Sequence, residues 1–486
     1  MNRKIIKNVD DSICLFIAMT ELSNIPINVD FDKITEEYVN NLITVYGRIH
    51  NIRKSGAKLV FIILRDRLTT LQCVCFKKTM NNDQFDSIAK LSAESLVLIT
   101  GKLSKLPDCT SLIKSCTYQN FELQVTSYQM VSNSLPDIPF VLDDADKLYT
   151  EENDRNGVSL PTRLNNRCFD LRVPFNNAIF SIQSGLVNGF REYLTKNNFT
   201  EIHSPKILGV SSESGASVFK LTYFDKPGYL AQSPQLYKQM VINSDFKRVY
   251  EIGPVFRAEN SVSHRHLCEF TGLDIEMALS PPFNYLEIVT TLWNILTYMF
   301  EYLEKNHTKQ ITYIKDKHHY NDLVYPCEPF WITFSEGVKL LEKNGFVQNL
   351  NEDLSTENEK QLGKIVKDVY NTDLFILTEY PTDARPFYTK KSDNKNFTKS
   401  YDIIMRGQEI CSGAQRENDY TTLTSQMLAL GLNLDPFYDY LTSFKYGSPP
   451  HGGGGFGLER ILMLYFDLEN VRITSLFPRD PNRIRP

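Results

Sequence analysis

The sequence lacks any glycine-rich loop ending in Gly-Lys-Ser or Gly-Lys-Thr, which excludes the usual lysine-bearing phosphate loop. It has no apolar run long enough to cross a bilayer, so we expect no membrane partner. Internal repeats and low-complexity tracts are also absent. The formal net charge is only -5 over 486 residues, so an indiscriminate polyanion binder is not indicated. A nucleic-acid partner would need a local basic face.

Cysteine is scattered and odd in number, which argues against a disulfide framework. The closest pair among the nine cysteines, Cys73 and Cys75, has one residue between them, whereas zinc ribbons use two. Reduced thiols and a cytoplasmic location are therefore predicted. The apolar run at 13–19 is short, follows Asp10 and Asp11, and precedes no small-residue cleavage site, so we expect no secretory signal.

The region 42–131 has the alternating pattern of short β-strands. Five strands with a helix at 83–93 between the third and fourth fit a small oligonucleotide-binding (OB) barrel. Between Val45 and Val125 there are 12 Lys/Arg against 6 Asp/Glu, which gives a mildly basic face. These features alone leave a β-domain without a nucleic-acid ligand equally open.

The rest of the chain mixes helices and strands, which indicates an α+β fold. Residues 133–175 are rich in acidic residues and proline and are typical of a linker. Period-two alternation predicts a hairpin over 248–277 with its loop at 260–268, and a strand over 401–412. Helices are predicted at 178–196, 285–303, 336–343, 356–370 (with Ser355 as its cap), 421–430 and 458–465.

Two arginines lie in settings suited to a polyphosphate. Arg257 lies in Val-Phe-Arg-Ala-Glu-Asn on the first arm of the hairpin, and Arg460 follows a run of four glycines at the start of a helix. An arginine fork is planar and permanently charged, so two of them can clamp a triphosphate without a phosphate loop. The sequence therefore predicts nucleotide chemistry on an antiparallel sheet.

Several further motifs occur in one order at 209–219, 229–235, 248–277, 412–416 and 453–486. With them the sequence resembles the class II aminoacyl-tRNA synthetases, and among these the eukaryotic-type cytoplasmic aspartyl-tRNA synthetases. The resemblance implies a five-stranded OB barrel that binds the anticodon, and a six- or seven-stranded antiparallel sheet flanked by helices. The implied domains are an N-terminal extension (1–38), the barrel (39–132), a linker (133–175) and the catalytic domain (176–486, with a helical insertion at about 282–398).

The resemblance also implies a two-step reaction. The α-carboxylate of aspartate attacks the α-phosphate of ATP and releases pyrophosphate, and the aspartyl group then passes to the 3′ end of tRNA(Asp). Both steps need positioning and charge stabilisation rather than a protein nucleophile. A homodimer is implied, formed through the helix at 178–196 and the strand after it, whereas membership of a larger synthetase complex is left open by the sequence.

The resemblance assigns Arg257, Arg460 and Glu409 to catalysis. Phe270 would stack beneath adenine, with Arg460 over the other face of the ring, although Phe270 alone would suit a core position equally well. Glu409 and Ser412 would bind Mg²⁺ together with the phosphates. The implied ATP-binding set is Arg257, Ala258, Glu259, Arg265, His266, Leu267, Phe270, Glu409, Gly457, Leu458, Glu459 and Arg460.

Selection of aspartate would depend on Lys238 and Arg416, because an anionic side chain needs fixed positive charge around it. A neutral asparagine would not repay the desolvation of Lys238. Taken alone, Lys238 would more often be an exposed helix lysine. The implied aspartate-binding set is Glu213, Gln235, Lys238, Arg257, Asp274, Ser412 and Arg416. On the barrel, Phe61 would stack on an anticodon base, and Gln72 and Glu122 would read base edges.

Two positions depart from the family pattern. Ser214 replaces a glycine in the loop that covers the substrate, and Gly452 replaces an alanine and is expected to add flexibility before the last helix. The sequence His-Arg-His at 264–266 has no second pair of ligands nearby and does not favour zinc. The alternatives to an aspartate enzyme are an asparaginyl or non-discriminating synthetase, a non-catalytic tRNA-binding paralogue, and an amide-forming ligase.

Overall fold

The computed structural model describes residues 26–107, 112–147, 157–210, 218–260 and 263–485. The chain divides into two compact units. Unit 1 comprises Met1–Ala145 and Arg172–Asn177, and unit 2 comprises Asp146–Leu171 and Ala178–Pro486. Over the described ranges, no helix has the length and apolar content needed to cross a membrane.

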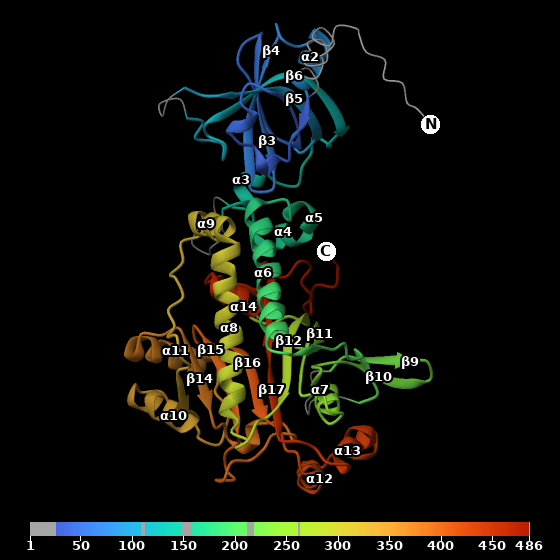
Figure 1. Ribbon diagram of the computed structural model, residues 1–486, viewed down its shortest axis with the longest axis vertical. Coiled ribbons are helices and arrows are strands. Elements are labelled where there is room, and N and C mark those ends of the chain that lie inside the picture. The colour runs from blue at the N-terminus through green and yellow to red at the C-terminus, as the bar shows by residue number, and fades with distance from the viewer. Residues whose placement is uncertain (1–25, 108–111, 148–156, 211–217, 261–262, 486) are drawn as a thin grey trace, which may run out of the picture. The chain divides into compact units, whose positions relative to one another are not determined.

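Unit 1 contains a closed five-stranded barrel (Figure 1). Its strands neighbour one another in the order β2-β3-β4-β6-β5, and β5 pairs again with β2 to close the barrel. Along each strand, alternate residues such as Ile43 and Val45 point inward and are fully buried. The strands are β1 (Ile27–Asn28), β2 (Leu42–Lys54), β3 (Leu59–Asp66), β4 (Thr69–Phe76), β5 (Leu96–Lys105) and β6 (Phe121–Ser132).

The predicted helix between the third and fourth barrel strands is present as α2 (Asn82–Ile88). Asn81 caps it by accepting a hydrogen bond from the backbone N–H of Asp83. The helix ends five residues earlier than the predicted 83–93, and the chain then turns into β5 through Glu94, which has a positive φ of 67°. A further short helix of unit 1 is α3 (Leu142–Ala145).

Unit 2 is built on an eight-stranded sheet with the order β13-β14-β15-β16-β17-β12-β11-β7. The six central strands are antiparallel, whereas β13 and β7 add parallel pairs at the two edges, beyond the predicted antiparallel sheet. The strands are β7 (Thr200–Glu201), β11 (Arg248–Phe256), β12 (Glu269–Ala278), β13 (Trp331–Thr333), β14 (Leu374–Thr378), β15 (Ser400–Met405), β16 (Gln408–Gln415) and β17 (His451–Gly457).

The predicted single strand at 401–412 is instead a hairpin of two strands. β15 and β16 are joined by Arg406 and Gly407, both of which have positive φ. Ser412 of β16 therefore lies directly opposite Asp402 of β15.

Two long helices cover one face of the sheet, and Figure 1 shows α6 (green) and α8 (yellow) side by side. Glycines on α6 allow the close approach: a Cβ at Gly189 would lie 3.2 Å from the Cα of Met299 on α8. The rings of Tyr193 and Tyr298 pack farther along, with their centroids 5.5 Å apart. α6 begins four residues before the predicted helix, at Pro174, a residue that suits the first helical turn.

The remaining helices surround the sheet, and α11 and α14 have the predicted bounds. Ser355 caps α11 by accepting from the N–H of Asn358, as predicted. The helices of unit 2 are α4 (Leu160–Asn165), α5 (Arg167–Asp170), α6 (Pro174–Lys196, begun in unit 1), α7 (Gln235–Ile242), α8 (Leu286–Asn306), α9 (Thr308–Lys317), α10 (Phe334–Lys343), α11 (Thr356–Tyr370), α12 (Tyr420–Ala429), α13 (Tyr438–Lys445) and α14 (Leu458–Tyr465).

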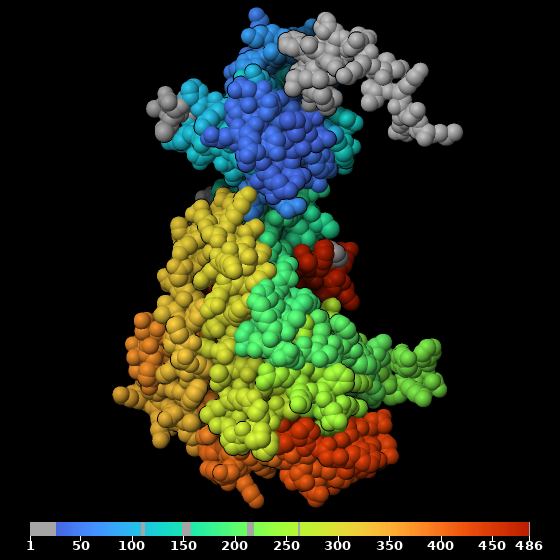
Figure 2. Space-filling model, in the orientation of Figure 1, coloured from blue at the N-terminus to red at the C-terminus, as the bar shows by residue number. Residues whose placement is uncertain are grey.

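A separate three-stranded sheet combines β8 (Ile207–Leu208), β9 (Lys220–Tyr223) and β10 (Lys226–Leu230). Figure 2 shows the β9–β10 hairpin (light green) standing out from the surface of unit 2. β10 leads directly into Ala231 and the N-terminus of α7, which carries Lys238. The sheet thus places α7 beside the central strands β11 and β12.

Candidate active site

The glycine run of β17 forms the floor of a cavity in unit 2. A Cβ at Gly453 would lie 2.0 Å from the carbonyl oxygen of Ile275, and one at Gly455 would lie 2.6 Å from Oδ1 of Asp274. The run therefore lets acidic side chains of β12 lie flat across β17. Gly452 is paired on both sides, with Met277 and Gln415, so the expected flexibility at this position is wrong.

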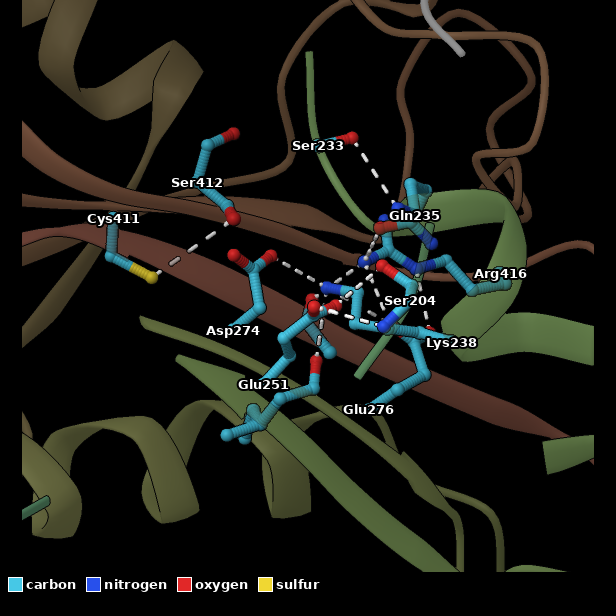
Figure 3. A network of polar contacts seen from close by, with 12 residues as sticks. Ser204, Ser233, Gln235, Lys238, Glu251, Asp274, Glu276, Cys411, Ser412 and Arg416 are labelled. Carbon is cyan, nitrogen blue, oxygen red and sulfur yellow. Dashed lines mark hydrogen bonds and ion pairs between the residues drawn. The ribbon is translucent and has the colours of Figure 1, made fainter. Parts of the chain in front are cut away.

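Over this floor, four charged side chains form a buried network (Figure 3). Lys238 Nζ lies 2.9 Å from Asp274 Oδ1 and 3.6 Å from Glu276 Oε2. Arg416 donates to both carboxylate oxygens of Glu276, at 2.9 and 3.2 Å, and to Gln235 Oε1 at 2.9 Å. The Lys238 side chain is 1% exposed and that of Glu276 is fully buried.

The two cations are thus balanced by two carboxylates within the protein. Burial alone would disfavour the charged form of Glu276, but Arg416 and Lys238 lower the pKa of this carboxyl. Lys238 is also held by Asp274, so its charge has carboxylate partners within the protein. Glu276 is absent from the predicted site residues, although period-two alternation places it on the same face of the strand as Asp274.

A second set of cations lines the same cavity, which has a volume of about 460 Å³. Arg257 lies one residue beyond the end of β11, and its guanidinium lies 5.6 Å from the centre of the Phe270 ring. Arg460 Nη1 donates to the Glu409 carbonyl oxygen at 2.7 Å, and Nη2 to that of Arg265 at 3.2 Å. These contacts hold Arg460 between β16 and the loop that carries Arg265.

The pKa of His266 reflects the positive charge of this region. Burial, together with repulsion from Arg460, Arg265 and Arg257, lowers the pKa of His266 to about 4. A histidine that stays neutral among three arginines indicates a site that favours an anion. His266 Nδ1 and Ser263 Oγ lie 2.6 Å apart, which fixes the ring in the loop.

Acidic oxygens face the arginines from β15 and β16. Burial, followed by repulsion from Asp402, raises the pKa of Glu409 to about 7. Asp402 Oδ1 is buried and has no hydrogen-bond partner among the described residues. Ser412, opposite Asp402 in the ladder, presents its hydroxyl to the same cavity. Carboxylate and hydroxyl oxygens are suitable ligands for Mg²⁺.

Two functional candidates, Arg385 and Glu359, come from the region predicted as an insertion. Arg385 lies 2.6 Å from Asp402 Oδ2 and donates to Ser412 Oγ at 2.9 Å. The Glu359 carboxylate on α11 accepts from the backbone N–H of Glu409 and from Arg265. Long-range packing brings these residues to the site, so their local sequence does not identify them.

The cavity brings together most of the predicted residues. Ala258 and Leu458, although described, do not line it, and Glu213 and the departure at Ser214 lie outside the described residues. Predicted residues that line the cavity are Gln235, Lys238, Arg257, Glu259, Arg265, His266, Leu267, Phe270, Asp274, Glu409, Ser412, Arg416, Gly457, Glu459 and Arg460.

The predicted anticodon residues share the outer face of the barrel in unit 1. Gln72 and Glu122 are opposite each other in the parallel pair β4–β6, and Gln72 Nε2 donates to Glu122 Oε2 at 2.9 Å. Phe61 lies on β3 with Arg53 over its ring at 5.0 Å. An aromatic surface beside a polar pair suits stacking and edge recognition of a base.

Comparisons with known proteins agree with this architecture. The family "tRNA synthetases class II (D, K and N)" matches residues 159–481, and the "OB-fold nucleic acid binding domain" family matches residues 43–131. The chain belongs to the class II tRNA synthetases. The predictions of this family, of its OB barrel and of an α+β fold are confirmed, and enzymes of this class use ATP as a substrate.

The chain is similar to several synthetases along nearly its whole length. It is 42% identical to the cytoplasmic aspartate–tRNA ligases of Caenorhabditis elegans and Bos taurus, over 94% of the chain and 88% and 91% of theirs. The aspartyl-tRNA synthetase structure of Entamoeba histolytica matches with a TM-score of 0.85 and 37% identity, covering 95% of this chain and 93% of that one.

An asparaginyl-tRNA synthetase also resembles this synthetase, at lower identity. The structure from Pyrococcus horikoshii, complexed with asparaginyl-adenylate, matches with a TM-score of 0.81 and 26% identity, covering 94% of this chain and 99% of that one. The fold is therefore common to both specificities, and the side chains of the cavity must decide between aspartate and asparagine.

Proposed function

We propose that this chain is an aspartate–tRNA ligase of the cytoplasm, which forms aspartyl-adenylate from ATP and transfers aspartate to tRNA(Asp). The observation that carries the proposal is the buried pair Lys238 and Arg416 at the glycine floor of an arginine-rich cavity. The chain's similarity to curated aspartate–tRNA ligases supports the same substrate.

In the proposed reaction, Arg257 and Arg460 bind the phosphates of ATP. Arg257 would neutralise the charge that develops on the α-phosphate as the aspartate α-carboxylate attacks it, because its fork can hold both groups. Phe270 lies beneath Arg257 and offers an aromatic face for adenine. With both reactants held in place, no protein nucleophile is needed.

Recognition of aspartate would proceed by exchange of ion pairs. The β-carboxylate of the substrate would take the place of Asp274 beside Lys238, and Asp274 would then accept the substrate ammonium group. Glu276 keeps Arg416 and Gln235 oriented throughout. An asparagine amide brings no charge for Lys238 and leaves a buried cation without its new partner, which is costly.

The acidic side of the cavity fits Mg²⁺. Glu409, the Ser412 hydroxyl and the buried Asp402 Oδ1, which has no hydrogen-bond partner among the described residues, form an oxygen set of the kind that this ion prefers. A bound Mg²⁺ would offset negative charge on the phosphates of ATP. Glu359 contributes by holding the backbone N–H of Glu409, which orients that side chain.

The proposed partners beyond the small substrates are tRNA and a second copy of the chain. Phe61, Gln72 and Glu122 would bind anticodon bases on the barrel. A homodimer would form through α6 and the adjoining β7, as the family resemblance implies. The proposed anticodon-binding region is 39–132 and the proposed catalytic region is 176–486.

The alternative function is an asparaginyl or non-discriminating synthetase. The structural similarity to the asparaginyl-tRNA synthetase of Pyrococcus horikoshii supports this alternative. ATP–pyrophosphate exchange with purified protein separates these functions when aspartate and asparagine are supplied in turn. We expect exchange with aspartate only. Exchange with asparagine alone would refute the aspartate assignment, and exchange with both would indicate a non-discriminating enzyme.

A further inference from the structure

Arg385 is a buried arginine bound to two oxygens of the proposed metal site. Its Nη2 lies 2.6 Å from Asp402 Oδ2, its Nη1 donates to Ser412 Oγ at 2.9 Å, and its guanidinium stacks 3.7 Å from the centre of the Tyr380 ring. The side chains of Arg385 and Asp402 are only 9% and 6% exposed. Stacking and pairing together fix the guanidinium in one place.

The surroundings of Arg385 are strongly acidic. Glu409 and Asp353 line this end of the cavity, and Asp402 lies beside them, paired with Arg385. Among the described residues, the cations that act on Glu409 include Arg460 and Arg385. Arg385 Nε and Asp402 Oδ1 are both buried and lack a hydrogen-bond partner among the residues that the structure describes. The site is therefore incompletely satisfied and able to take a further polar ligand.

We propose that Arg385 is a resident cation that keeps free divalent ions out of the acidic site until ATP arrives. Its guanidinium holds Ser412 and Asp402, the oxygens that the ion would need, and its charge repels a second cation. ATP phosphates bring additional oxygen ligands and negative charge, so that the ion enters together with the nucleotide. This inference rests on the proposed function, because it uses Glu409, Ser412 and Asp402 as metal ligands.

The test is binding of Mn²⁺ to the full chain without nucleotide, measured from the free-ion signal in electron paramagnetic resonance. We expect weak binding by the unaltered protein, and binding at least about tenfold tighter in Arg385→Met, which lacks the repelling charge. Arg385→Gln removes the charge but keeps a polar side chain, and should show the same gain. If Arg385→Met does not fold, Mn²⁺ binding by Arg385→Gln tests the inference instead.

Two variants serve as controls. Arg385→Lys retains the charge and should bind Mn²⁺ as weakly as the unaltered protein. Arg163→Met removes an equally buried arginine, paired with Asp170 at 2.6 Å outside the cavity, and should also change nothing. Unchanged or weaker Mn²⁺ binding in folded Arg385→Gln would overturn the inference, as would an equal gain in Arg163→Met.

A double variant locates the gained ion. Adding Glu409→Gln to Arg385→Gln should return Mn²⁺ binding to the weak level of the unaltered protein, and persistence of tight binding would place the ion elsewhere and overturn the inference. The proposed function is tested separately, by aspartate-dependent exchange in the unaltered protein. That exchange can stand while the Mn²⁺ result fails, so the two failures are distinguishable.

Discussion

Lys238 is the residue on which the choice of amino acid most depends, because it is buried and shared between Asp274 and Glu276. Lys238→Met should lower aspartate-dependent exchange by roughly a hundredfold or more, since it leaves carboxylates without their cation. ATP binding, measured by calorimetry, should be largely retained. Full exchange activity in this variant would refute the assigned role.

A control for that variant is Lys206→Met. Lys206 pairs with Glu251 at 2.6 Å in the same unit but does not line the cavity. Its loss should leave the Michaelis constant for aspartate unchanged. A comparable defect in both variants would mean that Lys238 acts through general stability instead of substrate binding.

Glu459 gives a prediction about pH. Burial raises the pKa of Glu459 from 4.5 to about 7, although the Thr271 backbone N–H donates to both carboxylate oxygens. The folded state therefore retains a proton that the unfolded state loses, so the free energy of unfolding falls as pH rises from about 4.5 to 7. Glu459→Gln cannot ionise and should gain up to roughly 3 kcal/mol relative to the unaltered protein above pH 7.

The gain can be measured by urea unfolding at pH 5 and pH 8. Both tryptophans, Trp293 and Trp331, lie in unit 2, so their fluorescence follows the unit that contains Glu459. The two proteins should differ little at pH 5 and clearly at pH 8. A difference of equal size at both values would show that Glu459 is ionised throughout.

For single residues, the sequence predicted the cations of the site better than the side chains that pair with them. Lys238, Arg257, Arg416 and Arg460 were found because their motifs surround them with recognisable neighbours. Glu276, Asp402 and Arg385 were not predicted as site residues. Each contacts the site through a side chain that is distant in the sequence. Arg385 and Asp402, for example, meet only after the chain has passed through the turn at 392–397 and entered β15.

At the scale of elements, β17 is a strand with almost no side chains, yet both of its faces are closely packed. Gly453 and Gly455 face the carboxylates of β12, whereas Gly452 and Gly454 face Ile288 and Leu292 of α8. Flexibility is therefore not what these glycines supply. Because these residues have no side chains, a helix and a charged network can pack closely on opposite sides of one strand.

The close packing of β17 predicts the effect of adding a single methyl group to it. Gly453→Ala would place a Cβ 2.0 Å from the Ile275 carbonyl and 2.6 Å from Glu276 Oε2. Unit 2 should lose about 2–3 kcal/mol of unfolding free energy, and binding of aspartate should weaken as Glu276 shifts away from Arg416. Tryptophan-monitored urea unfolding and calorimetric titration with aspartate measure the two effects.

Gly209→Ala is the matched control, because a Cβ there meets nothing within 4 Å in the part of the chain that the structure describes. Its unfolding free energy should change by less than about 0.5 kcal/mol. If Gly453→Ala behaved in the same way, the packing of β12 against β17 would have to be looser than the structure indicates.

Elements with strong local signals were predicted well. The cap at Ser355 and the apolar periodicity after it gave the bounds of α11, and the glycine run followed by an apolar stripe gave those of α14. The sequence predicts one strand over 401–412, whereas the structure has two strands, β15 and β16, joined by a tight turn. That turn contains Gly407, a residue that favours turns, whereas Arg406 before it gives no turn signal, and both have positive φ.

At the scale of the whole chain, two compact units divide the proposed tasks between nucleic acid and chemistry. Phe61→Ala should lower the efficiency of tRNA charging by about 5- to 150-fold, the equivalent of about 1–3 kcal/mol for one lost stack. Exchange of pyrophosphate, which needs no tRNA, should be unaffected. Charging with a transcript of tRNA(Asp) measures the first and an exchange assay the second.

Tyr46→Ala provides the comparison for Phe61→Ala. Tyr46 is an exposed aromatic on the same barrel, seven residues before Arg53 along β2. Its removal should leave charging efficiency nearly unchanged. Equal losses in both variants would indicate a general weakening of the barrel and would count against a specific anticodon face.

The family and both folds could be predicted from sequence because their motifs recur in a fixed order. The edge strand β7 lies within the strand predicted after the helix at 178–196, whereas β13, with three residues, is too short for a periodic signal. The domain limits stay predictions, as do the dimer and the individual roles of the site residues.

The central claim is that fixed cations receive the anionic side chain of aspartate and the phosphates of ATP. A crystal structure with a non-hydrolysable aspartyl-adenylate analogue tests it most directly. We predict the β-carboxylate within hydrogen-bond distance of Lys238 and Arg416, and the phosphate against Arg257. An analogue bound with its carboxylate away from Lys238, or with the Arg257 guanidinium turned into bulk solvent, would contradict the account.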